Sequence, residues 1–532
     1  MSGYKIGLDF GTTNSIISYF TPSAEVEAFQ YGGPDGRRYI PSFIGYDEEF
    51  VEIGTAARTL AANHGDVETY GNFKMRLPIP ADQLPEYIRH DRTPASVTTD
   101  YLRELLVSPE NPYSFCKQQG EISGLVVSVP EIWQRDIYNR GRELLKQAIA
   151  ALDLPLIQLV SEPVAAAAYY TWDMQRRAKQ AGDESFSGNL LVCDMGGGTF
   201  DVSLCRIYGE QKVDVLYFDG QGDRGLESAG VAFDRRCVQA AYRAKHDSTL
   251  DENDPEFLRL LREFETVKIS SHARVTRYLT NAVHEPEIYG DRQIYVFAGG
   301  YSLNFAQVRE AFAPIAAGIT EVIEGVRTWI AERQQTIDRV FLVGGFSQFF
   351  LVRRAIASAL QFATDDPRLD ETFNLTHSAY AISYGACLIA NDRVQPSEKY
   401  LHNLGIVVDT IDANAERQRR AIEIIKGGTR LEELSQPQFA DIPPLVTFQQ
   451  DAPLTLTLWV DPQGKGVLVE ESLPDMVKLP SYSPEDKWRV GMRVDRSQIA
   501  YLTIEEVRGE KRVEYELGNV LAKMFPGFVL IE

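Results

Sequence analysis

The chain contains 532 residues, of which 44% are apolar and 24% are charged, and its formal net charge at pH 7 is −21. This length accommodates several domains with substantial hydrophobic cores. The negative charge argues against nucleic acid or an anionic membrane as a general partner, because both would repel the protein.

The cysteines are scattered, odd in number and without a CxxC pair, which argues against a disulfide framework and a zinc site. They are Cys116, Cys193, Cys205, Cys237 and Cys387. The sequence shows no signal peptide and no apolar run long enough to cross a membrane. We therefore expect reduced thiols and a cytoplasmic location.

The first informative stretch, residues 4–20, reads YKIGLDFGTTNSIISYF. An apolar run that suits a buried strand ends at Asp9, then Gly11, Thr12 and Thr13 follow, and a second apolar run returns. Glycine adopts dihedrals closed to other residues and brings bare N–H groups close to a ligand. A carboxylate at the strand end is placed to hold a cation. The pattern predicts a hairpin that binds phosphate and magnesium.

A second copy of this pattern lies at residues 189–207, NLLVCDMGGGTFDVSLCRI, with Asp194 before three glycines. A glycine-rich turn without a ligand is the alternative for either copy alone. Two copies favour two similar half-domains, each contributing a phosphate loop to one nucleotide. Neither copy is a GxxxxGK[ST] loop or a GxGxxG fingerprint.

Apolar patterning elsewhere predicts alternating strands and helices up to about residue 390. Strands are expected at 125–129, 156–160, 212–219 and 340–343. Helices are expected at 101–107, 136–152, 164–170, 225–245, 251–274, 315–330, 351–360 and 379–390. The polar stretch at 171–188 predicts a loop. Residues 392–403 predict a linker, and residues 404–532 alternate in a way typical of an all-β domain.

With these pieces in order, residues 4–390 resemble the 70-kDa heat-shock chaperone family, within the wider superfamily of actin-like ATPases. The motifs that carry the resemblance are GLDFGTTNS (7–15), VSVP (127–130), SEPVAAAAYY (161–170), DMGGGTFDVS (194–203), ETVK (265–268) and LVGGFS (342–347). The resemblance implies an α/β, actin-like (ribonuclease H-like) ATPase domain over residues 1–391, with two lobes at about 1–187 and 188–391.

The resemblance also implies roles for single residues. Asp9 and Asp194 would hold hydrated Mg²⁺, and Lys74 would orient the attacking water beside the γ-phosphate of ATP. The implied catalytic set is Lys74, Glu162, Thr199 and Asp201. The implied ATP/ADP-binding set is Gly11, Thr12, Thr13, Asn14, Gly196, Gly197, Gly198, Thr199, Gly230, Glu265, Lys268, Gly344, Gly345 and Phe346.

Some implied roles have open alternatives. Outside their motif, Glu265 and Lys268 are more often an ion pair within one helix. Pro130 resembles the family's relay proline between the nucleotide and the interdomain surface. Its arginine partner is not fixed by the sequence; the candidates are Arg135, Arg140 and Arg142.

The sequence departs from the family in three features. Phe346 and Gln348 stand where a serine and an arginine are usual, so Phe346 could offer a ring face to the base, and the base preference is open. Residues 404–532 resemble the family's peptide-binding β-sandwich more weakly. SEKYL (397–401) replaces the leucine-rich acidic linker, and β-type sequence stands in place of the long helical lid. A lid-less member is therefore expected.

Three functions remain open from the sequence. The first is an ATP-hydrolysing, chaperone-like protein that binds unfolded peptide or a protein partner under nucleotide control, with a co-chaperone as a further partner. The second is a nucleotide-dependent switch or scaffold for one dedicated partner. The third is a small-molecule kinase, which would need a general base facing an acceptor; Asp201 is the candidate by position.

Overall fold

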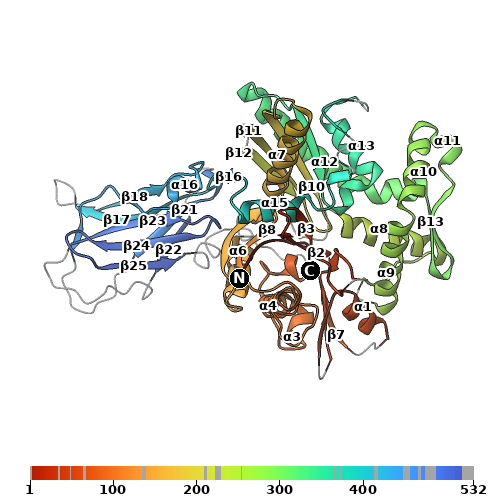
Figure 1. The fold of residues 1–532 in the computed structure, drawn as a ribbon, viewed down its shortest axis with the longest axis horizontal. Helices are drawn as coiled ribbons and strands as arrows, with labels where there is room; N and C mark the ends of the chain where they lie inside the picture. Colours follow the sequence, from red (N-terminus) through yellow and green to blue (C-terminus); the bar gives the residue numbers. More distant parts are fainter. Residues whose placement is uncertain are drawn as a thin grey trace.

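The structure is a computed structural model that describes residues 3–33, 36–47, 50–63, 67–134, 139–208, 212–221, 229–252, 254–363, 366–370, 374, 376–411, 417–446, 456–464, 466, 469–473 and 487–517. Figure 1 shows a larger α/β part, and beside it a group of strands formed by residues 403–517. None of the described helices has the length and apolar character needed to cross a bilayer.

The first sheet has the strand order β3-β2-β1-β8-β9, with β4 paired to β2. Its strands are β1 (Tyr4–Phe10), β2 (Asn14–Phe20), β3 (Val26–Ala28), β4 (Ile40–Pro41), β8 (Ile122–Val129) and β9 (Leu156–Ser161). β1 and β2 form the predicted antiparallel hairpin, whereas β8 and β9 run parallel to β1. β8 is almost wholly buried, as its apolar run predicts.

A smaller layer packs beside the first sheet. It contains a three-stranded sheet of β5 (Phe43–Tyr46), β6 (Val51–Ile53) and β7 (Glu68–Gly71). The helices are α1 (Gly54–Asn63), α2 (Phe73–Arg76), α3 (Pro85–Ile88), α4 (Pro94–Leu106), α5 (Phe115–Gln118) and α6 (Asn139–Ala150), with 3₁₀ turns at Ala81–Gln83 and Glu131–Gln134. α4 begins at a capping box formed by Thr93 and Ser96, followed by Pro94 at the first helical position.

The second sheet repeats the hairpin of the first. Its order is β15-β10-β11-β12-β16, and β10 pairs antiparallel with β11 and parallel with β15. The strands are β10 (Gly188–Met195), β11 (Phe200–Tyr208), β12 (Lys212–Gln221), β15 (Arg339–Val343) and β16 (Gln395–Ser397). β16 lies within the stretch expected to be a linker, so residues 395–397 extend this sheet.

Two helices pack between the sheets. α7 (Glu162–Ala181) and α15 (Ala381–Ala390) share one hydrophobic cluster with Val126 of the first sheet and Val192 and Phe341 of the second. The helices suit this position because their alanines permit close approach. At Gly385 a Cβ would lie 1.7 Å from the Ala165 carbonyl oxygen. The two sheets are thereby held in one arrangement.

The remaining helices of the larger part enclose the other face of the second sheet. They are α8 (Gly230–His246), α9 (Pro255–Ser270), α10 (His272–His284), α11 (Pro286–Tyr289), α12 (Phe305–Arg333) and α13 (Phe350–Ala359), with the hairpin of β13 (Gln293–Phe297) and β14 (Tyr301–Asn304), and 3₁₀ turns at Ala298–Gly300 and Gly345–Gln348. α12 starts at a capping box between Asn304 and Gln307.

Residues 403–517 form two antiparallel sheets around a separate hydrophobic cluster that includes Trp488. One has the order β18-β17-β21-β22. The other has the order β19-β23-β24-β25, and β20 also pairs with β23. The strands are β17 (Asn403–Ile411), β18 (Arg417–Ile425), β19 (Gln438–Phe439), β20 (Leu445–Val446), β21 (Leu456–Asp461), β22 (Val469–Leu473), β23 (Lys487–Val494), β24 (Ala500–Glu506) and β25 (Arg512–Glu516). The helical turns here are short: α16 (Leu431–Leu434) and a 3₁₀ turn at Pro462–Gly464. We call residues 403–517 the β region.

Most predicted elements are confirmed, and two predictions are wrong in detail. The expected loop at 171–188 is helical up to Ala181, where Gly182 in a left-handed conformation (φ 76°) ends α7. The expected helix at 251–274 is two helices, α9 and α10, which meet at Ser271. The starts of the helices expected at 136 and 225, and residues 518–532 of the expected β domain, lie outside the described residues.

Candidate functional site

The two predicted carboxylates occupy equivalent positions in the two hairpins. Asp9 lies near the end of β1, opposite Ser128 of β8, whose hydroxyl donates to Asp9 Oδ1 over 3.1 Å. Asp194 lies near the end of β10, opposite Asp201 on β11. The repeated sequence pattern therefore produces a repeated placement of acidic side chains at strand ends.

The two glycine loops touch each other. A Cβ added to Gly197 would lie 2.7 Å from Thr13 Cγ2, so a side chain larger than hydrogen would push the loops apart. Ser42 fixes the first loop, because its N–H donates to the Thr13 carbonyl (2.9 Å) and its hydroxyl to the Gly11 carbonyl (2.7 Å). We call the meeting place of the two loops, with Asp9 and Asp194, the hairpin junction.

Lys74 and Glu162 form a buried ion pair, with exposed fractions of 1% and 6%. Lys74 is carried by the single turn of α2, which follows Asn72 in a left-handed conformation. Glu162 is the first residue of α7. The Lys74 ammonium also lies 5.8 Å from the ring centre of Phe10 and 5.9 Å from that of Trp133.

Buried carboxylates outnumber the cations that face them. Burial, with the nearby charge of Glu162, raises the pKa of both Asp9 and Asp194. The same two causes raise the pKa of Asp201 to about 8. Lys74 opposes the shift for the two strand-end carboxylates only in part, so this group of side chains lacks positive charge.

A divalent cation fits this charge pattern. Asp201 Oδ1 accepts a hydrogen bond from the Ile132 N–H at 3.1 Å, while Asp201 Oδ2 is buried without a hydrogen-bond partner within 3.5 Å among the described residues. No three His, Cys, Asp or Glu side chains in the described ranges converge closely enough to bind a metal directly.

Gly230 and Gly344, two residues of the expected nucleotide-binding set, lie against the second glycine loop and its strand. The Gly230 N–H donates to the Gly196 carbonyl (3.2 Å) and the Val231 N–H to the Gly197 carbonyl (2.8 Å), so α8 begins against this loop. A Cβ on Gly230 would lie 3.4 Å from Phe346 Cβ. At Gly344, which has φ 83°, a Cβ would lie 2.3 Å from Asp194 Oδ1.

Phe346 is a buried core residue. Its ring stacks on Phe349, with centres 5.3 Å apart and planes 12° apart, and it also contacts Phe233. Only 6% of Phe346 is exposed, so little of its ring is free to meet a base. The Lys268 ammonium lies 5.4 Å from the centre of the same ring.

Glu265 and Lys268 do not pair with each other, so their interpretation as one helical ion pair is wrong. Lys268 donates to both carboxylate oxygens of Asp234 on α8, at 2.7 and 2.6 Å. Glu265 lies 3.6 Å from Arg58 of α1, which joins α9 to the layer beside the first sheet. Sequence spacing could not reveal either partner, because both come from other helices.

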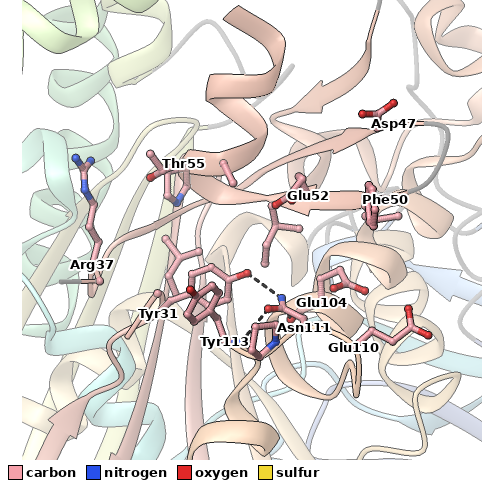
Figure 2. Close-up of a pocket in the computed structure, with 18 of the residues that line it drawn as sticks. Tyr31, Arg37, Asp47, Phe50, Glu52, Thr55, Glu104, Glu110, Asn111 and Tyr113 are labelled. Carbon is pink, nitrogen blue, oxygen red and sulfur yellow. Dashed lines mark hydrogen bonds between the residues drawn. The ribbon is translucent and has the colours of Figure 1, made fainter. Parts of the chain in front are cut away.

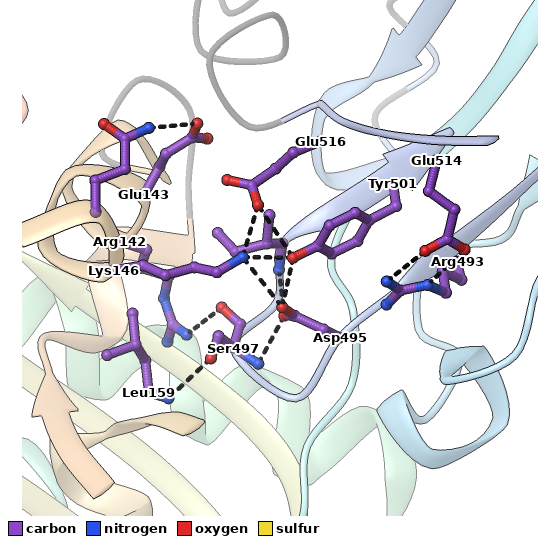
Figure 3. Close-up of polar contacts among 12 residues, drawn as sticks. Arg142, Glu143, Lys146, Leu159, Arg493, Asp495, Ser497, Tyr501, Glu514 and Glu516 are labelled. Carbon is purple, nitrogen blue, oxygen red and sulfur yellow. Dashed lines mark hydrogen bonds and ion pairs between the residues drawn. The ribbon is translucent and has the colours of Figure 1, made fainter. Parts of the chain in front are cut away.

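Pro130 is buried directly after β8, and of the three candidate arginine partners Arg142 is wholly buried. Arg142 donates to the Ser497 carbonyl in the β region over 3.2 Å, and the Ser497 hydroxyl accepts from the Leu159 N–H at 3.0 Å (Figure 3). Arg140 is only partly buried, and Arg135 lies outside the described residues. The relay role itself stays a prediction.

Sequence reasoning missed the neighbour of Arg142 on α6, Lys146. Its ammonium donates to Glu516 Oε2 over 2.7 Å, contacts the Tyr501 hydroxyl and lies 3.6 Å from Asp495 Oδ2 (Figure 3). The available signal was weak: a lysine on an amphipathic helix is usually solvated. We call the contact of Arg142 and Lys146 with the β region the α6 contact.

Comparison with known proteins agrees with this geometry. A family model described as Hsp70 protein matches residues 90–391. A Chaperone protein DnaK from Thermosipho africanus is 25% identical over 362 residues, which cover 66% of this chain and 54% of the relative. One from Thermotoga petrophila is 26% identical over 364 residues, with coverage of 66% and 54%. A Chaperone protein HscA homolog from Laribacter hongkongensis is 26% identical over 375 residues, with coverage of 66% and 53%.

The chain spans about half the length of the curated relatives it matches. The family model nevertheless covers more than half of the 532 residues and includes α7, both strands of the second hairpin and the Gly344 turn. The chain belongs to the Hsp70 protein family.

Proposed function

We propose that this protein binds ATP with Mg²⁺ at the hairpin junction and hydrolyses it slowly. The observation that carries the proposal is the meeting of two Asp–Gly hairpins around one buried lysine, in a group of carboxylates short of positive charge. Backbone N–H groups of the two glycine loops bind the phosphates. Bound magnesium neutralises the carboxylates and the phosphate oxygens, with Asp9 and Asp194 holding its water shell.

Lys74 and Glu162 act together in this scheme. Lys74 positions the attacking water and stabilises negative charge on the γ-phosphate, while Glu162 holds the ammonium in place. Thr199 and Asp201 complete the catalytic group at the second loop. Phosphoryl transfer needs positioning and electrostatic stabilisation more than covalent chemistry, and these residues supply both.

We further propose that the nucleotide state controls the β region, which binds a peptide or protein partner. The α6 contact supports this second step, because it ties α6 and β9 of the larger part to the turn between β23 and β24 and to the end of β25. Gln498 in the same turn donates to Glu398 Oε2 over 3.1 Å, next to β16. A change in either sheet would therefore reach the β region through direct contacts.

Substitution of Lys74 tests the catalytic proposal. Lys74→Ala should lower ATP turnover by about two orders of magnitude while ADP binding, measured by calorimetry, is retained. Lys179→Ala, an exposed lysine in the last turn of α7, is the matched control. Lys74→Ala leaves Glu162 buried without its partner, which can destabilise the fold. ADP binding is therefore also measured for the double variant with Glu162→Gln, which removes the unpaired charge and checks that inactivity is not misfolding. Near-normal turnover of Lys74→Ala would contradict its role.

A turnover assay with different additions separates the three functions. Stimulation by an unfolded peptide supports the chaperone-like function. Nucleotide-dependent change in shape with turnover that no peptide accelerates favours a switch for one dedicated partner. ADP release that depends on a sugar or polyol acceptor would show a kinase and overturn the proposal.

A further inference from the structure

A pocket of about 720 Å³ opens in the layer beside the first sheet (Figure 2). Its walls come from residues 31–32 and 36–41, from residues 46–47 and 50–53 of β5, β6 and their flanks, from the start of α1 and from the connection between α4 and α5. None of its lining residues belongs to the nucleotide-binding set proposed above. The pocket is large enough for an amino-acid side chain together with part of the backbone that carries it.

Asn111 makes the floor of this pocket rigid. Its amide nitrogen donates to the Tyr31 hydroxyl and to the Glu104 carbonyl, both at 2.9 Å, and its amide oxygen accepts from the Tyr113 N–H at 2.9 Å. The Tyr31 and Tyr113 rings meet edge to face, with centres 6.1 Å apart. Two aromatic rings and the end of α4 are thus held in place before any ligand binds.

The residues that line the pocket expose apolar surface. Among the residues that the structure describes, eleven large hydrophobic side chains are exposed, and four of them line this pocket. They are Phe50 (63%), Tyr113 (45%), Tyr39 (40%) and Val51 (37%). Such a concentration on one pocket is typical of a surface that meets another protein segment.

The charge of the pocket is negative on one side. Glu52, Glu104 and Glu110 line it and form no ion pair with another described residue. Arg92 is already engaged, because its guanidinium lies 3.6 Å from the Tyr46 ring centre and forms ion pairs with Glu68 and Asp100. Figure 2 shows Arg37 on the side opposite Glu104 and Glu110.

We propose that this pocket receives an arginine or lysine side chain from an extended segment of a partner protein. The cation would lie between the tyrosine rings of the floor and the glutamates, where ring faces and carboxylates both attract it. The flanking residues of the segment would cover Phe50 and Val51. This binding site is separate from the β region and does not depend on nucleotide hydrolysis.

Peptide binding to the full chain tests the proposal. The probe is a dye-labelled peptide Gly-Gly-Leu-Arg-Leu-Gly-Gly, and its matched neutral form carries citrulline in place of arginine. Fluorescence anisotropy should show the arginine peptide binding about tenfold more tightly than the citrulline peptide. Equal affinities would overturn the proposal.

Variants locate the bound peptide. Glu104→Gln with Glu110→Gln should remove the preference for arginine. Glu285→Gln with Glu287→Gln makes the same change in charge at exposed positions near α11 and should leave the preference intact. An unchanged preference in the first pair would mean that the peptide binds elsewhere, for example at the β region, and would overturn the assignment. Circular dichroism checks that both pairs fold.

A further variant distinguishes a peptide segment from a small organic cation. Phe50→Ala should weaken the heptapeptide several-fold but leave N-acetylarginine amide, followed by ligand-observed NMR, unaffected. The opposite outcome is a heptapeptide that binds no more tightly than N-acetylarginine amide, with Phe50→Ala lowering the affinity of neither ligand. That result would show a site for small cations, and the partner-protein proposal would be wrong.

Discussion

At the scale of single residues, the structure gives the glycines in and beside the hairpin junction distinct tasks. Gly197 lets the two loops touch, because a Cβ there would meet Thr13. Gly344 has φ 83° and lies against Asp194 and the Met195 carbonyl. Gly196 and Gly345 have open space around the position of a Cβ. The sequence shows glycine at all four positions, and only the packing around each one shows which positions require glycine.

Alanine at Gly344 should destabilise the protein even without a ligand. Its Cβ would lie 2.3 Å from Asp194 Oδ1 and 2.5 Å from the Met195 carbonyl oxygen, in a backbone region that is strained for alanine by roughly 1–3 kcal/mol before any clash. We expect the midpoint of thermal unfolding to fall by several degrees. Gly345→Ala, with no atom within 4 Å of the added Cβ, is the control and should unfold as the unchanged protein does.

The same substitution should weaken magnesium-dependent nucleotide binding, because it displaces the carboxylate proposed to hold the ion. Calorimetry with ADP, in the presence and absence of magnesium, measures this effect. A Gly344→Ala protein as stable as Gly345→Ala would contradict the packing of Gly344 against Asp194.

At the scale of elements, the sequence predicted strands and amphipathic helices well, and it failed where a helix has little apolar periodicity. The second half of α7 is rich in polar residues, and it is helical because its charged side chains pair along the helix. Buried Asp173 accepts a hydrogen bond from Arg177 over 2.6 Å, and Arg176 lies 5.0 Å from the Trp172 ring centre. Likewise, β16 is too short to produce alternation, and its pairing with β12 decides its conformation.

The α6 contact is an element-scale feature that one substitution should weaken. Lys146→Met keeps the apolar stem but loses the ammonium, which contacts Glu516, Tyr501 and Asp495. These carboxylates are only partly exposed, so we expect the equilibrium between the docked and undocked β region to shift by about tenfold. Small-angle X-ray scattering should report a larger radius of gyration. Lys179→Met in α7 is the control, and an unchanged radius in both variants would contradict the assigned strength of the contact.

At the scale of the whole molecule, the sequence motifs predicted the hairpin junction because each motif is local. They could not predict which parts meet across long stretches of chain. Arg142 and Ser497 are 355 positions apart, and no feature of either sequence neighbourhood indicates the other. The burial of Phe346 is of the same kind, since its stacking partners come from α8 and from the turn before α13.

Docking of the β region should depend on pH, because it buries carboxyl groups. Glu143 on α6 is buried beside Glu516 and Lys146; burial and then the charge of Glu516 raise its pKa to about 7. Burial also raises the pKa of Glu398 to about 7, although Arg142 and Gln498 oppose the shift. In an undocked, exposed state these carboxyls would return toward their ordinary value of 4.5.

These pKa values set the direction in which docking changes with pH. Between about pH 4.5 and 7 the docked state binds more protons than the undocked state, so this contribution to docking is fully present at low pH and is lost as the pH rises through about 7. Each carboxyl can change the docking constant by up to about tenfold per pH unit within that window.

Small-angle X-ray scattering on nucleotide-free protein from pH 5.5 to 8.5 should show progressive undocking. Glu143→Gln, which is neutral at every pH, should flatten the profile and keep the β region docked at higher pH. Docking would not be linked to protonation of Glu143 and Glu398 if the pH profile of the unchanged protein were flat. The same would follow if the profiles of Glu143→Gln and Glu398→Gln were as steep as that of the unchanged protein.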